Sequence, residues 1–218
     1  MRPAPLPNGF ALPTLMVMLA LASIATLVAM RNIWVNEQLL NAEADRLRTQ
    51  HKAEAVLPMA LADILGTATN NDGTTNLRHA LGNATQTHAF FPNTMAEFDV
   101  LRQRLGTNVC SVGICAPHAL NASTTKASYW KSQTASAMPI SASHTPYGDD
   151  TAWYWVEVFP QHGTSTANTP SSIPFTYRIT TMAHGVMPGS STVLQAIWTR
   201  SSDTSPSGQW HSWHVLHD

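Results

Sequence analysis

Histidines are the residues of this chain with the most obvious capacity for chemistry, because the sequence of 218 residues contains ten of them. Three of them, His211, His214 and His217, recur in the segment HSWHVLH. On a strand, His214 would face away from the other two, and His211 and His217 would lie about 20 Å apart at roughly 3.3 Å per residue. A helix would gather them, but the segment is short, follows Gly208 and is rich in Trp and Val. The sequence therefore favours surface histidines over a metal site.

Acidic residues in loops offer a second route to chemistry, through the binding of cations. Asp72 lies in NNDGTT, and Asp149 and Asp150 lie in YGDDT. Neither segment has the ligand spacing of an EF-hand, and turn formation is the commoner reason for Asp in such segments. The sequence also lacks the Gly-x-Ser-x-Gly, HExxH and phosphate-loop patterns. We therefore predict neither an enzymatic activity nor a cofactor.

Two cysteines, Cys110 and Cys115, lie close together in the segment NVCSVGICAP. A metal site would need four ligands, so in a small polar domain this pair favours a disulfide. Closing such a short loop would stabilise the fold by about 2 kcal/mol in the chain-entropy model. A disulfide would place this part of the chain on the far side of a membrane, whereas two free buried thiols are the alternative.

The composition restricts the possible partners of the chain. Charged residues make up 11% of the sequence and the net charge is −1, while Ser, Thr, Asn and Gln are frequent after Gly66. No basic patch is present of the kind that binds nucleic acid. Solubility must then come from uncharged polar side chains.

An uncharged segment near the N-terminus predicts a membrane span. Residues 10–30 contain no charged side chain and would form a helix of about 31 Å, which is the thickness of one bilayer. The apolar run continues to Arg31 without a small-x-small cleavage site, so ordinary signal peptidase is not expected to remove it. Trp34 would lie at the level of the lipid headgroups. Basic residues on both sides leave the orientation open by the positive-inside rule.

The helical pattern continues past the span as far as Gly66, which gives one helix of about 55 residues. Pro58 should kink this helix near its end, and Gly66 should stop it. The apolar residues repeat at helical spacing in two groups, while charged residues, Asp45 among them, occupy other faces. The first group is Leu40, Ala44 and Leu47, and the second is Leu57, Leu61 and Ile64.

The middle of the chain predicts little regular structure apart from one helix. In NTMAEFDVLRQRLG, Thr94 and Glu97 form a capping box pattern, and Gly106 ends the segment. Phe98, Leu101 and Leu105 would form the apolar face of this helix. We interpret residues 67–92 and 116–150 as loops, with one turn of helix around TTNLRHAL.

The last third of the chain changes to the pattern of strands. AWYWVEVF, PFTYRITT, STVLQAIWTR and GQWHSWHVLHD are separated by turn-rich segments, which predicts an antiparallel sheet. The economical way to bury the apolar face of this sheet is to pack it against the second half of the long helix. The predicted fold class is therefore α+β.

Five of the seven tryptophans fall on these strands. Large aromatic residues in a small sheet more often belong to the core than to a binding surface. By strand alternation, Trp153 and Trp155 share one face of the sheet, whereas Trp210 and Trp213 do not. An exposed Trp cluster at one sheet edge would instead favour adhesion or a carbohydrate contact.

Several of these features resemble a known family, the precursors of type IV pilins. The resemblance rests on the short leader ending in Gly9, on Phe10 as the first residue of a mature chain, and on the uncharged span with its helical continuation. Residues 38–57, and the segments CSVGICAP and YRITTMAHGV with STVLQAIW, are similar to the minor pilins called PilX-like. In the first group the residues are Gln38, Asn41, Asp45 and Arg46, followed by KAEAVL, and Trp130 follows the cysteine loop.

The resemblance implies a leader at residues 1–9, a long helix at residues 10–66 and a globular pilin domain at residues 67–218 with its strands in residues 151–218. It implies cleavage between Gly9 and Phe10 by a prepilin peptidase, followed by methylation of the new amine. The subunit would lie in the inner membrane with a periplasmic C-terminal domain and would then enter a pilus fibre. Its partners would be major and minor pilins, a tip adhesin, the prepilin peptidase and the inner-membrane assembly platform.

Thr14 departs from the pattern of major pilins. These carry Glu at the fifth mature position, where the carboxylate offsets the positive amine of a neighbouring subunit in an apolar medium. A hydroxyl group cannot neutralise an ammonium group. We therefore expect this subunit at a filament tip or in a complex that initiates assembly, with effects on twitching motility, adhesion or DNA uptake. The leader also departs from the pattern, because Arg2 is its one basic residue and it contains three prolines.

Two other functions remain open at the level of sequence. The chain also fits a pseudopilin of a type II secretion system, a class closely related to the pilins. It would also suit a membrane-anchored periplasmic module whose sheet domain binds a ligand or an envelope protein. Removal of the leader and extraction from the membrane distinguish a pilin from an anchored module.

Overall fold

The structure is a computed structural model, and it describes residues 11–68, 78, 89–121, 123–140, 152–161, 175–200 and 207–216. The chain divides into two compact units, Met1–Ala44 and Asp45–Asp218. Several predicted features lie outside the described residues. They are the leader, the turn of helix around residues 74–81 except Arg78, and the candidate cation ligands Asp72, Asp149 and Asp150.

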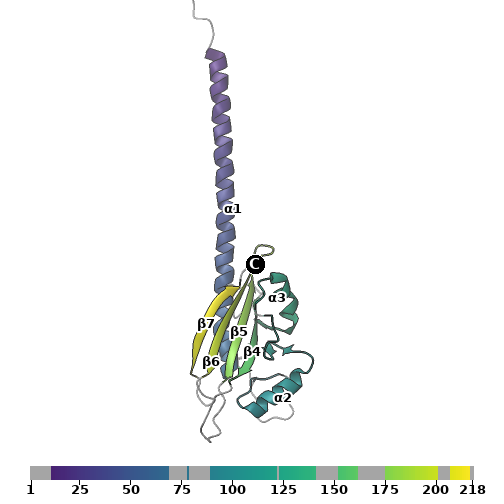
Figure 1. The fold of residues 1–218 in the computed structure, drawn as a ribbon. Coiled ribbons are helices and arrows are strands. Elements are labelled where there is room, and N and C mark those ends of the chain that lie inside the picture. The colour runs from purple at the N-terminus through teal and green to yellow at the C-terminus, as the bar shows by residue number, and fades with distance from the viewer. Residues whose placement is uncertain are drawn as a thin grey trace, which may run out of the picture. The chain divides into compact units, whose positions relative to one another are not determined.

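Helix α1, Ala11–Leu65, has 55 residues, as the sequence predicts, and Figure 1 shows it as one continuous element. Pro58 lies inside α1, which continues through it to Leu65. Gly66 ends the helix with a positive φ of 71°, a conformation that glycine adopts at little cost. The amide of Thr67 then donates to the Ala62 carbonyl at 2.8 Å. The predicted stop at Gly66 is therefore confirmed.

One sheet, with seven strands among the described residues, forms the centre of the second unit. Its antiparallel strands β4, β5, β6 and β7 are the four that the sequence predicts (Figure 1). Strand β2 pairs with β4 in parallel, β1 pairs with β2, and β3 pairs with β4. The bounds are β1 Cys110–Ser111, β2 Ile114–Cys115, β3 Met138–Ile140, β4 Ala152–Pro160, β5 Phe175–His184, β6 Ser191–Arg200 and β7 Gly208–Leu216.

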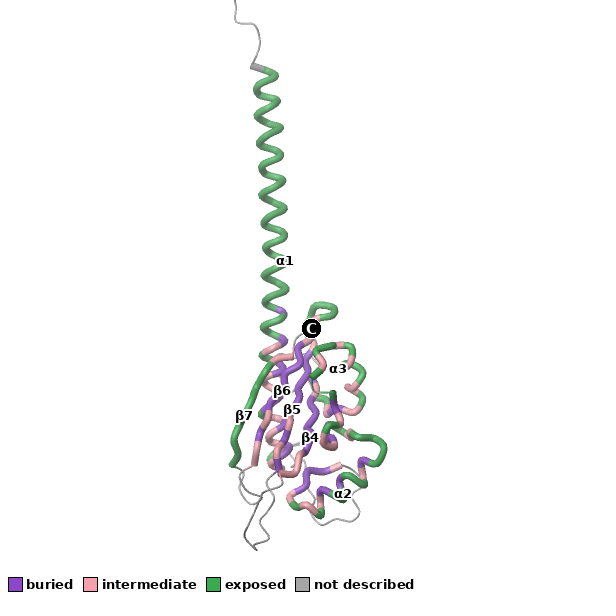
Figure 2. Tube along the Cα trace, viewed as in Figure 1, coloured by how far each residue is buried: buried purple, intermediate pink, exposed green. Residues whose placement is uncertain are grey.

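The sheet has a hydrophobic core on each face. The larger core joins the second half of α1 to the inner face of the sheet, and it includes Val56 and Ile64 of α1 and Tyr177 and Leu194 of the sheet, all fully buried. This α+β packing is the predicted one. The smaller core lies on the outer face, where Trp130 packs against Trp155 with ring centroids 5.6 Å apart. In Figure 2 the central strands are buried, whereas most of β7 is exposed.

Helix α2, Met95–Leu105, follows its sequence signals closely. The amide of Glu97 donates to the Thr94 hydroxyl, and the Glu97 carboxylate accepts from the Thr94 amide in return, which completes the predicted capping box. Phe98, Leu101 and Leu105 are buried, as predicted. The larger core therefore also includes one face of α2.

Residues 116–150 contain more structure than the predicted loop. Helix α3, Ala127–Gln133, is followed by the short helix η1, Thr134–Ser136, and by β3. Helix α3 is too short to show apolar periodicity, and Trp130 is its one buried residue. Its Nε1 donates to the Thr124 carbonyl at 3.1 Å. Packing of a single tryptophan, rather than a repeating pattern, holds this helix in place.

Candidate functional site

The first unit consists of a helix segment whose apolar side chains are exposed. All residues from Leu12 to Ala44 are exposed. Helix α1 contains a window of 18 residues with a mean hydropathy of 2.2 and no buried residue, so by length and composition it is able to cross a membrane. Two hydroxyl groups in this segment bond within the helix: Ser23 donates to the Leu19 carbonyl at 2.7 Å, and Thr26 donates to the Ala22 carbonyl at 3.1 Å. Such internal bonds suit a lipid or protein environment that lacks water.

The predicted processing residues lie at the start of this unit. Gly9 and Phe10 are outside the described residues, so cleavage and methylation there stay predictions. Thr14 lies in the first turns of α1, and it is exposed. The side chain at this position ends in a hydroxyl group rather than a carboxylate. Helix α1 has no acidic residue in its first turn.

The second unit begins at Asp45, a buried residue that the sequence interpretation assigned to a polar face. Its carboxylate accepts hydrogen bonds from the amides of Val186 and Met187, at 2.9 and 3.2 Å, in the turn between β5 and β6. Burial by itself would raise the pKa of Asp45, but these amides, the Ser190 hydroxyl and the charge of Arg48 lower it below 3.8. Asp45 thus fixes the β5–β6 turn to α1.

The first of the two apolar groups on α1 is exposed, and the side chains buried at this point of the helix are polar. Leu40 is 71% exposed and Leu47 is 49% exposed, whereas Asp45, Thr49 and Lys52 are buried. The side of α1 that faces the sheet is polar here because the turn and strand β5 present polar groups to it. Farther along, Leu57 and Ile64 are buried as predicted.

Gly185 explains why the β5–β6 turn approaches α1 so closely. A Cβ atom at this position would lie 2.5 Å from the Asp45 carboxylate and 2.6 Å from the Thr49 hydroxyl. Any larger residue would push the turn away from the helix. The neighbouring hydrogen bond from Val186 to Asp45 joins residues 141 positions apart in the sequence, and periodicity carries no signal for it.

A buried ionic cluster fixes the other end of the helix. The Tyr154 hydroxyl donates to the Asp63 carboxylate at 2.6 Å, and the Arg78 guanidinium lies 3.0 Å from the same carboxylate. Burial, with the negative charge of Asp63, raises the pKa of Tyr154, which therefore remains a hydrogen-bond donor. The Arg78 group also donates to the Val112 carbonyl at 2.5 Å. This cluster connects α1, β4 and the cysteine hairpin.

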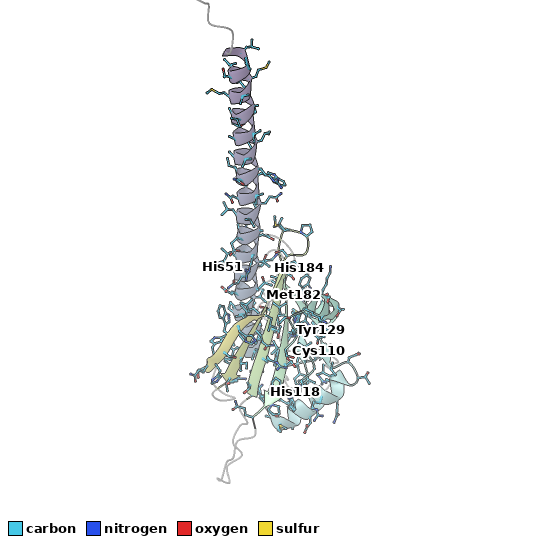
Figure 3. All side chains as sticks on the ribbon, turned by 45° about the horizontal axis from the view of Figure 1, so that its top comes forward. His51, Cys110, His118, Tyr129, Met182 and His184 are labelled. Atoms are coloured by element: carbon cyan, nitrogen blue, oxygen red, sulfur yellow. A yellow bond between two sulfur atoms is a disulfide. The ribbon has the colours of Figure 1, made fainter. Side chains whose placement is uncertain are left out.

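The disulfide between Cys110 and Cys115 is present, with the sulfur atoms 2.06 Å apart. It closes the hairpin of β1 and β2, whose turn contains Val112 and Gly113, both with positive φ. A Cβ atom at Gly113 would lie 2.7 Å from the Met138 side chain, so only glycine fits there. The Cys110 sulfur is shown in Figure 3. The disulfide closes the hairpin, whose strand β2 pairs with β4.

The histidines do not form a metal site in the part of the chain that the structure describes. No group of three metal-ligating side chains is present among these residues, and His217 lies outside them. Strand β7 contains one irregularity, since Trp198 pairs with Trp210 and Ile197 pairs with Ser212. His211 is therefore an extra residue, which forms a β-bulge. The residues of β7 that precede the bulge lie on the opposite face of the sheet from the one that regular alternation would give them.

An open cavity of about 340 Å³ lies beside the β5–β6 turn and is lined in part by Ser128, Lys131 and His184. His184 and Met182 of this lining are labelled in Figure 3. Burial is the main cause that lowers the pKa of His184 below 6.5, and the charges of Lys131 and Lys52 lower this pKa further. A hydrogen bond with the backbone of Ser190 has the opposite effect and raises it. The lowered pKa favours the neutral form of His184.

The tryptophans divide between the cores and the open edge of the sheet. Trp155 and Trp198 are buried, and Trp153 packs against the smaller core on the same face as Trp155, as predicted. The prediction that Trp210 and Trp213 lie on opposite faces is wrong, because the bulge at His211 brings both to the α1 side of the sheet. They are 43% and 52% exposed.

A long N-terminal helix that is exposed over its apolar half, followed by a sheet that covers its second half, is the architecture of a pilin-like protein. The comparison with known families agrees. Residues 111–200 match the family described as the C-terminal part of the type IV pilus assembly protein PilX. Over these residues the chain is similar to PilX, and the match supports a PilX-like pilin with a role in type IV pilus assembly. No curated protein and no solved structure shows a significant match.

Proposed function

We propose that this chain is a minor pilin that acts at the start of type IV pilus assembly or at the pilus tip. The observation that carries the proposal is the combination of a PilX match in the sheet domain with an exposed, uncharged helix segment in the same chain. The apolar segment suits storage in the inner membrane before assembly and a packed helical core after it. The exposed sheet domain would then face other pilus components.

Thr14 supports a place outside the repeating part of the filament. In a filament core, the terminal amine of each subunit needs a nearby negative charge, because an unpaired ion in an apolar medium costs several kcal/mol. A subunit with Thr14 gives its neighbour no such charge. The position with no such neighbour is the tip, where the partners would be other minor pilins and a tip adhesin.

The first experiment measures the intact mass and the N-terminal peptide of the chain extracted from membranes, in cells with and without the prepilin peptidase. The proposal predicts a chain that begins at N-methylated Phe10 and that is lost without the peptidase. A chain that still begins at Met1 would contradict the proposal and favour a membrane-anchored binding module. Deletion of the pilus genes, compared with deletion of the genes of a type II secretion system, distinguishes a minor pilin from a pseudopilin.

The second experiment tests the tip position with immunogold labelling of sheared filaments. We expect label at one end of each filament, and we expect Thr14→Glu to shift part of the label along its length. Thr26→Glu is a matched control, because it places a carboxylate in the same exposed segment at a different depth and should not promote incorporation. Even labelling of the unmodified chain along the filaments would contradict the tip position.

A further inference from the structure

The two edges of the sheet are built differently. At one edge, β1 and β2 have two residues each and are closed by the disulfide, and the three-residue β3 contains Pro139. At the other edge, β7 has nine residues and contains neither proline nor any Asp, Glu, Lys or Arg. Free edges in native sheets are usually protected by short strands, prolines or charged residues, because open backbone groups pair with other strands. The first edge has short strands and a proline, and β7 has none of these three features, although its bulge at His211 is another feature that limits pairing at a free edge.

Strand β7 also exposes its side chains. Every residue from Gly208 to His214 is exposed (Figure 2). Among the described strands, β7 pairs with β6 alone. Alternate amide and carbonyl groups of β7 therefore point away from the sheet toward an edge that no described strand occupies.

The bulge at His211 gives this edge an apolar face. The residues of β6 opposite Trp210, Trp213 and Val215 are Trp198, Ala196 and Leu194, and these three belong to the core on the α1 side. Directly paired residues share a face of the sheet. The apolar inner face thus continues from β6 into β7, where two tryptophans extend it beyond the packed core.

We propose that β7 is the docking edge for one extended strand of a second, different protein. That strand would pair with the open backbone groups of β7, and every second side chain would be apolar and would cover Trp210 and Trp213. A helix or a lipid surface would cover the tryptophans but would leave the backbone groups unpaired, whereas a strand does both. Because β7 carries no charged residue, we expect the interaction to change little with salt concentration.

A second copy of this chain fits the edge less well. The bulge lies within β7, so antiparallel pairing of two β7 strands would place two bulges in one ladder, and each bulge interrupts the hydrogen bonds around it. A ladder between β7 and a regular strand of another protein would contain only one bulge. The inference goes beyond the proposed function, since a subunit that stays anchored in the membrane would keep the same edge.

The test uses the full chain in its own cells, with the photoreactive residue p-benzoylphenylalanine placed at Gln209, Ser212 or His214, one at a time. Crosslinked peptides are then identified by mass spectrometry. The proposal predicts that the three positions label one short segment of one other protein, and that the labelled residue moves along this segment in step with the position on β7. Labels that are scattered, that follow helical spacing, that fall on copies of this chain, or that are absent would overturn it. The mass of the N-terminal peptide in the same samples reports separately on the proposed pilin processing.

Three variants test whether the tryptophan face carries the contact. Trp213→Thr keeps a residue suited to a strand but removes the aromatic surface, and we expect the crosslinking yield from Ser212 to fall about tenfold, whereas Trp213→Phe should keep most of it. Val109→Thr, an exposed apolar residue before β1, is the matched control and should leave the yield unchanged. An unchanged yield in Trp213→Thr would overturn the role of this face, and thermal unfolding of each variant shows whether the domain is intact.

Discussion

Helix α1 has two parts that are opposite in composition and in environment. From Leu12 to Ala44, the side chains are mostly apolar and all are exposed. From Asp45 to Ile64, the buried side chains include Asp45, Lys52 and Asp63. An apolar side chain gains free energy only when something covers it, and a polar one tolerates burial when it is hydrogen-bonded. The first part thus depends on surroundings outside the chain, whereas the second is already satisfied by the sheet.

The largest expected difference between the two parts comes from the same substitution made in each. Ile64→Ala removes a fully buried side chain, and we expect it to lower the free energy of unfolding by about 2–5 kcal/mol. Ile24→Ala removes a side chain that is 58% exposed, and the expected change is within about 0.5 kcal/mol. Denaturant unfolding of the full chain in detergent micelles measures both. Equal losses of stability in the two variants would contradict the difference between the two parts of α1.

A smaller effect is expected where the two parts meet, at Asp45. Asp45→Ala leaves the buried amides of Val186 and Met187 without their acceptor, which should cost about 1–3 kcal/mol. Glu43→Ala changes an exposed carboxylate two residues earlier and should have almost no effect. Because the folded pKa of Asp45 lies below 3.8, its contribution is complete above that pH and is lost as the pH falls below it. Unfolding of both variants at neutral and acidic pH checks the sign.

The smallest expected effect concerns His184, at the start of the same turn. Burial lowers its folded pKa below 6.5, so below that pH the unfolded chain binds a proton that the folded chain does not. The contribution of His184 to stability should therefore be complete above pH 6.5 and should decrease as the pH falls through the region below it. The unfolding midpoint of the unmodified chain should decrease more between about pH 7 and pH 5.5 than that of His184→Gln. Identical pH profiles would contradict this assignment.

The sequence was sufficient where local signals decide the structure. The end of α1 at Gly66, the capping box of α2 and the four long strands are all set by residues close together in the chain. The sequence was insufficient where residues far apart in the chain determine the structure. The buried face of α1 near Asp45 depends on a turn 141 residues away, and the bulge at His211 reverses an assignment that strand alternation makes from spacing alone.

The candidate site was predictable in part for the same reason. The uncharged span, predicted as residues 10–30, and the pair Cys110 and Cys115 were identified from composition and spacing. The exposed edge of β7 was not, because in sequence β7 resembles the other three long strands, and only the order of strands in the sheet makes it an edge. The sequence gives no such order.

The contact between Asp45 and the β5–β6 turn also has a consequence for the timing of synthesis. The ribosome completes Asp45 well before Val186, which follows 141 residues later, and at 5–20 residues per second this interval is on the order of ten seconds. During that interval Val56 and Ile64 are made, but β5 and β6, which supply Tyr177 and Leu194 to the same core, are not. A premature stop before β5 would therefore leave this face of α1 only partly covered, by α2 and β4.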